Sequence, residues 1–277
     1  MNFTIIDTNC FLAYLTIGDF MFYKNDGITM YYEIHGNKKG EKVLILPGWG
    51  DTRITFYNLI EKMKRQFQIY IVDYPGFGNS PFPKKDLTIY DYAMLIKNFM
   101  FDNNIENPVI IAHSFGGRIS IILSGLYKVR INKMVLIDIA GIRRKSIKRF
   151  LKQKLYKFRK RLTFFLPKKK RIKYLTSLKK KYSSVDYISL DKSMYNTFKN
   201  IINEDLRKYV KYISCNVLLL WGLNDIDTPI NDGYFFNKKI KNSHLMIFPK
   251  GSHFVYLEYK EIIGEVIINF IEKQSLF

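Results

Sequence analysis

The segment from Val109 to Arg118, which reads V-I-I-A-H-S-F-G-G-R, constrains the fold more than any other part of the chain. A short apolar run stops at Ser114, and a helix-like segment follows. This pattern indicates a strand that turns tightly into a helix and presents one side chain at the rim of a sheet. Ala112 and Gly116 lie two residues on either side of the serine, where a strained turn has no room for bulk. The segment has the form of a nucleophile elbow, with alanine in the first position of G-x-S-x-G.

Strand-like and helix-like segments alternate along most of the chain. The expected strands are 19–23, 28–35, 42–46, 68–72, 109–112, 133–139, 216–221 and 244–248. The expected helices are 54–65, 87–101, 115–126 and 258–273. Apolar strands separated by helices predict an α/β fold, with a mainly parallel twisted sheet and helices on both faces.

About 75 residues without a strand signal separate the strands at 133–139 and 216–221. Because an ordinary crossover is much shorter, we expect an inserted helical cap over residues 143–212. Apolar residues recur in it at helical spacing as far as Pro167, and again over 172–178. The cap holds 24 Lys and Arg against four acids, so nearly all of the net charge of +21 lies there. The expected core is then 20–142 and 213–277, and residues 1–19 form an N-terminal extension.

Composition narrows the class of protein further. No apolar run reaches the roughly 18 residues that a membrane-spanning helix needs. Residues 10–17 are too short for a signal peptide and have no cationic residue ahead of them, so we expect a cytoplasmic protein. Cys10 and Cys215 lie far apart and fit neither a metal site nor a disulfide framework.

A serine hydroxyl becomes a nucleophile when an imidazole takes its proton and a carboxylate orients that imidazole. Of the four histidines, His253 lies in a loop beyond the last strand, where a general base is expected. His113 directly precedes Ser114, so its side chain should point away from the hydroxyl and be buried. His35 and His244 lie at strand ends and are expected to pack or to face solvent.

Five motifs together resemble the α/β-hydrolase family, over about residues 20–277. They are L-I-L-P-G-W-G, D-Y-P-G-F-G-N-S, A-H-S-F-G-G, L-L-L-W-G-L-N-D and G-S-H-F. The resemblance implies that Ser114 is the nucleophile, His253 the general base and Asp225 the acid that orients it. It says little about the substrate.

Three aspartates compete for the role of the acid. The family pattern places it at Asp225, four residues beyond Trp221. Asp227 lies two residues further on, and Asp138 ends the strand before the cap, from which some family members supply the acid. Asp73 is expected to brace the loop that follows it.

Acyl transfer also needs hydrogen-bond donors for the developing oxyanion. The backbone N–H groups of Phe115 and Trp49 are expected to form this oxyanion hole. Here the sequence departs from the family, because Pro47-Gly48 replaces the common His-Gly pair. The backbone donor is unaffected by this change.

The sequence therefore predicts a serine hydrolase that cleaves an ester, a thioester or a related acyl bond of a small-molecule substrate. Carbon–carbon bond hydrolysis and perhydrolysis use the same residues and are not excluded. Ser114 at the elbow argues against dehalogenases and epoxide hydrolases, which use an aspartate nucleophile. The sequence contains neither a metal-ligand cluster nor a dinucleotide-binding fingerprint, so no cofactor is expected. The competing hypothesis is a non-catalytic scaffold whose basic cap binds an anionic membrane or a polyanion. Nucleic acid is disfavoured because no binding motif accompanies the charge.

Overall fold

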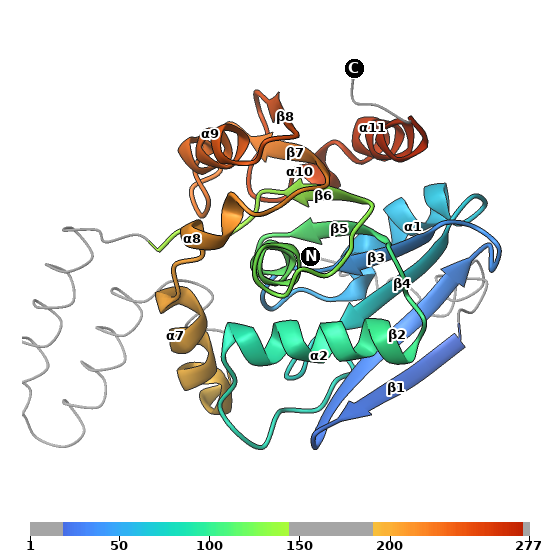
Figure 1. The fold of residues 1–277 in the computed structure, drawn as a ribbon, viewed down its shortest axis with the longest axis vertical. Helices are drawn as coiled ribbons and strands as arrows, with labels where there is room; N and C mark the ends of the chain where they lie inside the picture. The colour runs from blue at the N-terminus through green and yellow to red at the C-terminus, as the bar shows by residue number, and fades with distance from the viewer. Residues whose placement is uncertain (1–18, 144–190, 274–277) are drawn as a thin grey trace, which may run out of the picture.

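The computed structural model describes residues 19–143 and 191–273, and these residues build one twisted eight-stranded sheet (Figure 1). The strands are β1 (Asp19–Asn25), β2 (Ile28–Gly36), β3 (Lys42–Leu46), β4 (Gln68–Asp73), β5 (Val109–His113), β6 (Lys133–Ile137), β7 (Asn216–Gly222) and β8 (Ser243–Phe248). Their order in the sheet is β1-β2-β4-β3-β5-β6-β7-β8. Strand β2 is antiparallel to both of its neighbours, and all other pairs are parallel. The predicted α/β fold with a mainly parallel sheet is confirmed.

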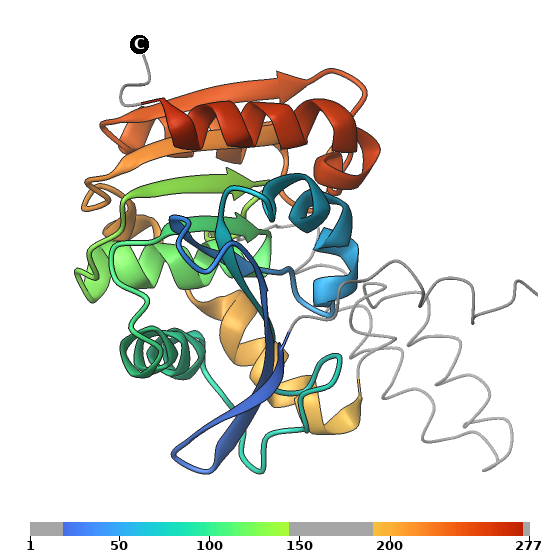
Figure 2. The same ribbon diagram turned by 90° about the vertical axis from the view of Figure 1, so that its right-hand side faces the viewer.

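Helices cover both faces of the sheet. One face carries α2 (Ile89–Asp102), α3 (Phe115–Ile121), α8 (Arg207–Val210) and α9 (Ile230–Lys239). The other carries α1 (Tyr57–Met63), α10 (Val255–Glu258) and α11 (Lys260–Glu272). Figure 2 looks onto this second face, with α11 in red in front of the strands. Within 19–143 and 191–273, no helix is long and apolar enough to cross a membrane.

Side chains of β5 alternate between two buried cores, as the period of a strand requires. Ile110 and Ala112 belong to the core under α2 and α3, whereas Val109 and Ile111 belong to the core under α1 and α11. Because β3, β5, β6, β7 and β8 run parallel, the loops that follow them meet at one edge of the sheet. In open α/β sheets, functional sites lie at this edge.

Several helix boundaries differ from the sequence prediction. The expected helix 54–65 begins as a 3-10 helix at Arg53–Phe56 before α1, and 115–126 ends in a π-helical turn at Ile122–Leu126. A Cβ at Gly125 would lie 2.5 Å from the carbonyl oxygen of Tyr209, so the last turn is shaped by the close approach of α8. The expected helix 258–273 corresponds to α11, which begins at Lys260, and the short helix α10 precedes it.

Of the predicted cap, the structure describes Arg143, which lies in neither a helix nor a strand, and residues 191–212, which are mainly helical. The latter contain a 3-10 helix at Lys192–Met194, α7 (Tyr195–Asn203) and α8. Helix α7 lies beside the start of α2 (Figure 1), where the Leu87 N–H donates to Thr197 Oγ1 at 2.9 Å. The predicted helix ending at Pro167, the segment 172–178 and residues 1–18 of the extension lie outside the described residues. The cap and its boundaries therefore stay a prediction.

Candidate active site

Ser114 lies at the turn between β5 and α3 with φ 45° and ψ −104°. Such a conformation costs a non-glycine residue on the order of 1–3 kcal/mol, so the surrounding structure has to hold it. The Ser114 N–H donates to Ile137 O at 3.1 Å, and its carbonyl accepts from the Ala140 N–H at 3.0 Å. A Cβ at Gly116 would lie 2.0 Å from the carbonyl oxygen of Leu46, which explains why a glycine stands two positions after the serine.

The structure brings Ser114, His253 and Asp225 into contact at the carboxyl edge of the sheet. Nε2 of His253 lies 3.0 Å from the Ser114 Oγ, and Nδ1 lies 2.8 Å from Asp225 Oδ2. The imidazole thus bridges a hydroxyl and a carboxylate through its two nitrogens. This geometry lets a proton pass from the serine to the imidazole.

The carboxylate of Asp225 is held by the loop that follows β7. Its Oδ1 accepts from the backbone N–H groups of Asp227 at 2.8 Å and Thr228 at 2.9 Å. Its Oδ2 accepts from the Thr228 hydroxyl at 2.6 Å. These hydrogen bonds hold the carboxylate in the orientation in which its Oδ2 contacts the ring of His253.

The electrostatics follow from these contacts. Burial disfavours the charged imidazolium of His253, but the bond to Asp225 and the charges of Asp225, Asp138 and Asp227 outweigh it and raise the pKa of His253 above 6.5. Burial likewise opposes ionisation of Asp225, but the bond from His253 and the donors of Thr228 hold the pKa of Asp225 below 3.8. The contact between the two residues therefore favours an ionised Asp225 and a more basic imidazole at His253.

The two competing aspartates are placed differently. Asp138 Oδ1 accepts from the Gly222 N–H at 2.8 Å, and its buried Oδ2 has no hydrogen-bond partner among the described residues. Burial first, and then the charge of Asp225, raise the pKa of Asp138 to about 7. The side chain of Asp227 is exposed. Of the three aspartates, Asp225 is the one whose carboxylate bonds to the imidazole in the described structure.

The two backbone groups proposed for the oxyanion hole lie on adjoining turns. The Gly116 N–H donates to Pro47 O at 3.0 Å, which ties the start of α3 to the turn that contains Trp49. The rings of Trp49 and Phe115 meet edge to face, 5.3 Å apart. Pro47-Gly48 has a packing role here, because a Cβ at Gly48 would lie 2.8 Å from Nδ1 of His113.

An aromatic wall, which we define as Trp49, Phe77, Phe115 and Phe198, lies beside this turn. The ring of Trp49 lies 4.7 Å from that of Phe77 and 5.2 Å from that of Phe198 on α7. Neither Phe77 nor Phe198 was expected at the site from the sequence. Phe77 is part of the D-Y-P-G-F-G-N-S motif, whereas no local signal marks Phe198, because its role depends on how α7 packs.

Two predictions about supporting residues are confirmed. His113 is buried and bonds away from the serine hydroxyl, with its Nε2 2.8 Å from the carbonyl oxygen of His253. Asp73 braces the loop after β4, because its Oδ2 accepts from the Asn79 N–H at 3.0 Å. His35 is buried against Glu33, with 2.8 Å between its Nε2 and Oε2 of the carboxylate.

Asp225, Asp227 and His253 also offer metal-ligand atoms within 4.8 Å of one another. However, Nδ1 of His253 and Oδ2 of Asp225 already bond to each other, and Thr228 donates to the same oxygen. A cation would have to break both contacts. The arrangement fits proton transfer better than metal binding.

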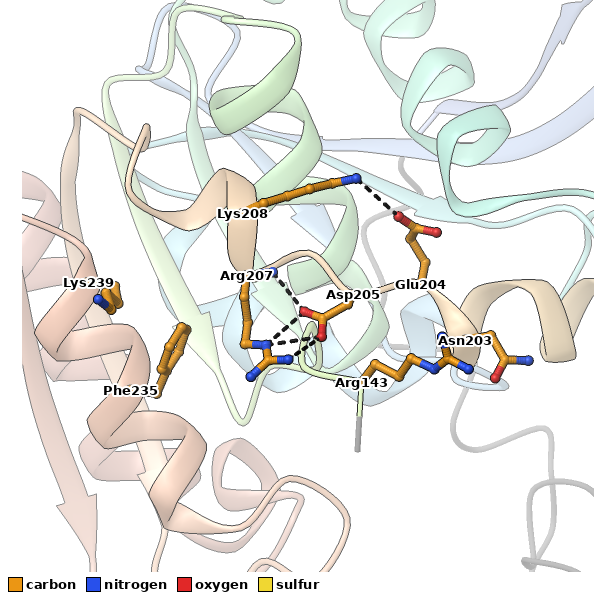
Figure 3. Close-up of a pocket in the computed structure, with 8 residues that line it drawn as sticks. All are labelled: Arg143, Asn203, Glu204, Asp205, Arg207, Lys208, Phe235 and Lys239. Atoms are coloured by element: carbon orange, nitrogen blue, oxygen red, sulfur yellow. Dashed lines mark hydrogen bonds and ion pairs between the residues drawn. The ribbon is translucent and has the colours of Figure 1, made fainter. Parts of the chain in front are cut away.

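A separate hollow of about 700 Å³ opens between α7, α8 and α9 (Figure 3). It is lined by Arg143, Asn203, Glu204, Asp205, Arg207, Lys208, Phe235 and Lys239. Its two carboxylates are paired, Asp205 with Arg207 at 2.6 Å and Glu204 with Lys208 at 3.7 Å. None of the candidate catalytic residues lines it, so we do not assign the chemistry to this hollow.

Comparisons with known proteins agree with this arrangement. Residues 42–259 match the sequence profile of the alpha/beta hydrolase fold. Curated relatives match most of the chain. "Uncharacterized hydrolase YugF" of Bacillus subtilis is 24% identical, covering 89% of this chain and 96% of its own. "Pimeloyl-[acyl-carrier protein] methyl ester esterase" of Wigglesworthia glossinidia brevipalpis is also 24% identical, and the match covers 83% of this chain and 93% of the relative.

Solved structures show the same fold. An esterase from Exiguobacterium antarcticum superposes with a TM-score of 0.73 at 18% identity, covering 93% of this chain and 100% of its own. The enol-lactonase from Burkholderia xenovorans gives a TM-score of 0.71 at 18% identity, and the match covers 91% of this chain and 100% of the enol-lactonase chain. At these identities the likeness concerns the fold alone.

The sheet order, the elbow after β5 and the loops at the carboxyl edge define an α/β enzyme fold of the hydrolase type. The chain belongs to the alpha/beta hydrolase family, and the protein is a hydrolase.

Proposed function

We propose that the protein is a serine hydrolase that cleaves a carboxylic ester, a thioester or a related acyl bond through an acyl-enzyme on Ser114. The observation that carries the proposal is the continuous contact from the Ser114 hydroxyl through His253 to Asp225, at 3.0 and 2.8 Å. The names of two similar proteins, a methyl ester esterase and an enol-lactonase, both refer to ester bonds and support this class of substrate.

In the proposed reaction, His253 Nε2 takes the proton of Ser114 while Oγ attacks the acyl carbon. The tetrahedral oxyanion accepts hydrogen bonds from the backbone N–H groups of Trp49 and Phe115, each worth roughly 3 kcal/mol in the transition state. The imidazolium, stabilised by Asp225, then protonates the departing alcohol or thiol. A water molecule, deprotonated by the same imidazole, hydrolyses the acyl-enzyme and restores the serine.

The test uses a fluorophosphonate probe, which reacts covalently with activated serines, together with short-chain p-nitrophenyl esters. We expect the wild type to be labelled and to hydrolyse at least one ester, and Ser114→Ala to lose both activities. Ser120→Ala is the matched control, because Ser120 lies on α3 and its hydroxyl donates to Gly116 O at 2.9 Å. A folded wild type that neither reacts with the probe nor cleaves any ester would favour the non-catalytic scaffold instead.

A further inference from the structure

His113 occupies the last position of β5, directly before Ser114, and is 1% exposed. Side chains alternate along a strand, so His113 lies on the face that carries α1, α10 and α11. There its Nε2 meets the main-chain carbonyl oxygen of His253 at 2.8 Å. The residue before the candidate nucleophile thus contacts the backbone of the candidate base.

The partners of its ring define the tautomer of His113. A carbonyl oxygen only accepts, so Nε2 carries the proton and donates it. Nδ1 has no hydrogen-bond partner among the described residues, and the nearest carboxylate oxygen, Asp51 Oδ2, lies 3.9 Å away. Burial first, and then the charge of His253, lower the pKa of His113 to about 3. His113 is therefore neutral, with a single N–H donor.

Packing leaves this ring little freedom. Its centroid lies 4.9 Å from that of His253 and 4.9 Å from that of Tyr256. Gly48 lies against Nδ1, where any Cβ would be 2.8 Å away. Tyr256 in turn donates to Asp51 Oδ2 at 2.8 Å, which ties α10 to the turn that carries Trp49. His113 thus lies where the elbow, the oxyanion turn and the loop of His253 meet.

We propose that His113 is a positioning residue, whose N–H holds the main-chain carbonyl of His253 and so keeps its imidazole between Ser114 and Asp225. The inference rests on the proposed function. The loop of His253 follows the edge strand β8, which has one neighbour in the sheet, and so depends on contacts such as this one. Because a shift of about 1 Å in a reacting group can cost up to roughly 100-fold in rate, one buried bond of this kind can control turnover.

The test compares three replacements of His113. His113→Gln carries an amide N–H near the position of Nε2, His113→Asn is too short to reach the carbonyl, and His113→Leu has no donor. On p-nitrophenyl esters we expect His113→Leu and His113→Asn to lower kcat on the order of 10- to 100-fold with KM nearly unchanged. His113→Gln should recover most of the loss, whereas a purely packing role would rank leucine above glutamine.

His35→Leu is the matched control, because His35 is also a buried histidine but bonds to Glu33. It should change the melting temperature without a selective loss of kcat. Circular dichroism establishes that each variant is folded. If His113→Leu does not fold, the comparison of His113→Gln with His113→Asn decides the question.

A second readout does not depend on turnover. The chain has four histidines, so NMR spectra of the labelled imidazoles contain few ring signals. The Nδ1 proton that His253 shares with Asp225 should give a downfield signal in the wild type, His113→Gln and His35→Leu. We expect it to be lost or shifted in His113→Leu and His113→Asn. If folded His113→Leu keeps both this signal and kcat, the positioning role is wrong, whereas a wild type with the signal but no reactivity contradicts the proposed function instead.

Discussion

At the scale of the residue, two buried aspartates lie near the ring of His253, and their hydrogen bonds separate their roles. Both oxygens of Asp225 accept bonds from the loop 227–228, and Oδ2 also meets the imidazole. Asp138 instead receives one backbone N–H from Gly222, and its other oxygen is buried without a partner in the described structure. An ionised, fully bonded carboxylate suits the orienting role, while a carboxyl with a raised pKa does not.

We therefore expect Asp225→Asn to lower kcat by on the order of 10²- to 10⁴-fold, because an amide would favour the wrong imidazole tautomer. Asp138→Asn should keep kcat within about tenfold of the wild type, since its carboxylate makes no bond to the ring. Steady-state hydrolysis of p-nitrophenyl esters measures both. The reverse order of losses would transfer the orienting role to Asp138.

The activity should also depend on pH through His253. Its pKa is raised above 6.5, so the base is progressively protonated, and ester hydrolysis lost, as the pH falls through that raised value. The hydrogen bond and the charge of Asp225 contribute most to the elevation, so the residual activity of Asp225→Asn should have its acidic limb at lower pH. Profiles of kcat/KM from about pH 5 to about pH 9 test the shift. A limb that stays in place, or moves to higher pH, would contradict it.

The sequence could identify these residues only in part. The elbow is a local pattern, because the strand, the serine and the small residues are consecutive, so Ser114 could be predicted directly. His253 could be predicted as the base because it lies in a loop beyond the last strand, whereas the other three histidines lie at strand ends or beside the serine. Sequence alone left three aspartates open for the acid, because the choice depends on the loop after β7, where the hydroxyl of Thr228 and two backbone N–H groups fix Asp225.

At the scale of the element, β-strands were easier to predict than helices. Strands β3 to β7 are almost fully buried runs of mainly apolar residues. The bounds of all the described strands agree with the expected ranges to within two residues. Helix α9 was missed, since Asn231, Asp232 and Gly233 are poor helix formers at its start. Gly233 is needed there because a Cβ would lie 2.9 Å from the indole of Trp221, a tertiary contact that the sequence does not show.

Helix α7 supplies the clearest prediction at this scale. Phe198 on α7 contacts the ring of Trp49, beside the turn proposed to form the oxyanion hole. Truncation by Phe198→Ala should raise kcat/KM for long-chain relative to short-chain p-nitrophenyl esters, by on the order of 10-fold, because more acyl chain can be buried. Asn200→Ala, an exposed position on the same helix, is the control and should leave the ratio unchanged. An unaltered ratio in folded Phe198→Ala would show that the acyl group does not lie against this wall.

At the scale of the whole molecule, the charge is unevenly distributed. Residues 143–212 hold 24 of the 45 Lys and Arg but four of the 24 acids, so the rest of the chain is nearly neutral. A general compositional bias towards lysine would spread the excess along the chain. A cluster of cations on one segment favours binding to an anionic surface, and each exposed Lys or Arg contributes up to about 1 kcal/mol of binding free energy next to anionic lipid.

We therefore expect the full chain to bind phosphatidylglycerol vesicles and not phosphatidylcholine vesicles, with binding that weakens as salt shortens the Debye length from about 10 Å at 0.1 M. Two charge-matched triple variants locate the effect. Glutamine at Lys168, Lys169 and Lys170 should weaken co-sedimentation with the anionic vesicles, whereas glutamine at the exposed Lys24, Lys38 and Lys39, outside the basic segment, should not. Equal losses would mean that net charge acts without regard to position. Equal binding to both lipids would contradict an electrostatic interaction, and it would leave the lysines of 143–212 as a solvated surface of the hydrolase.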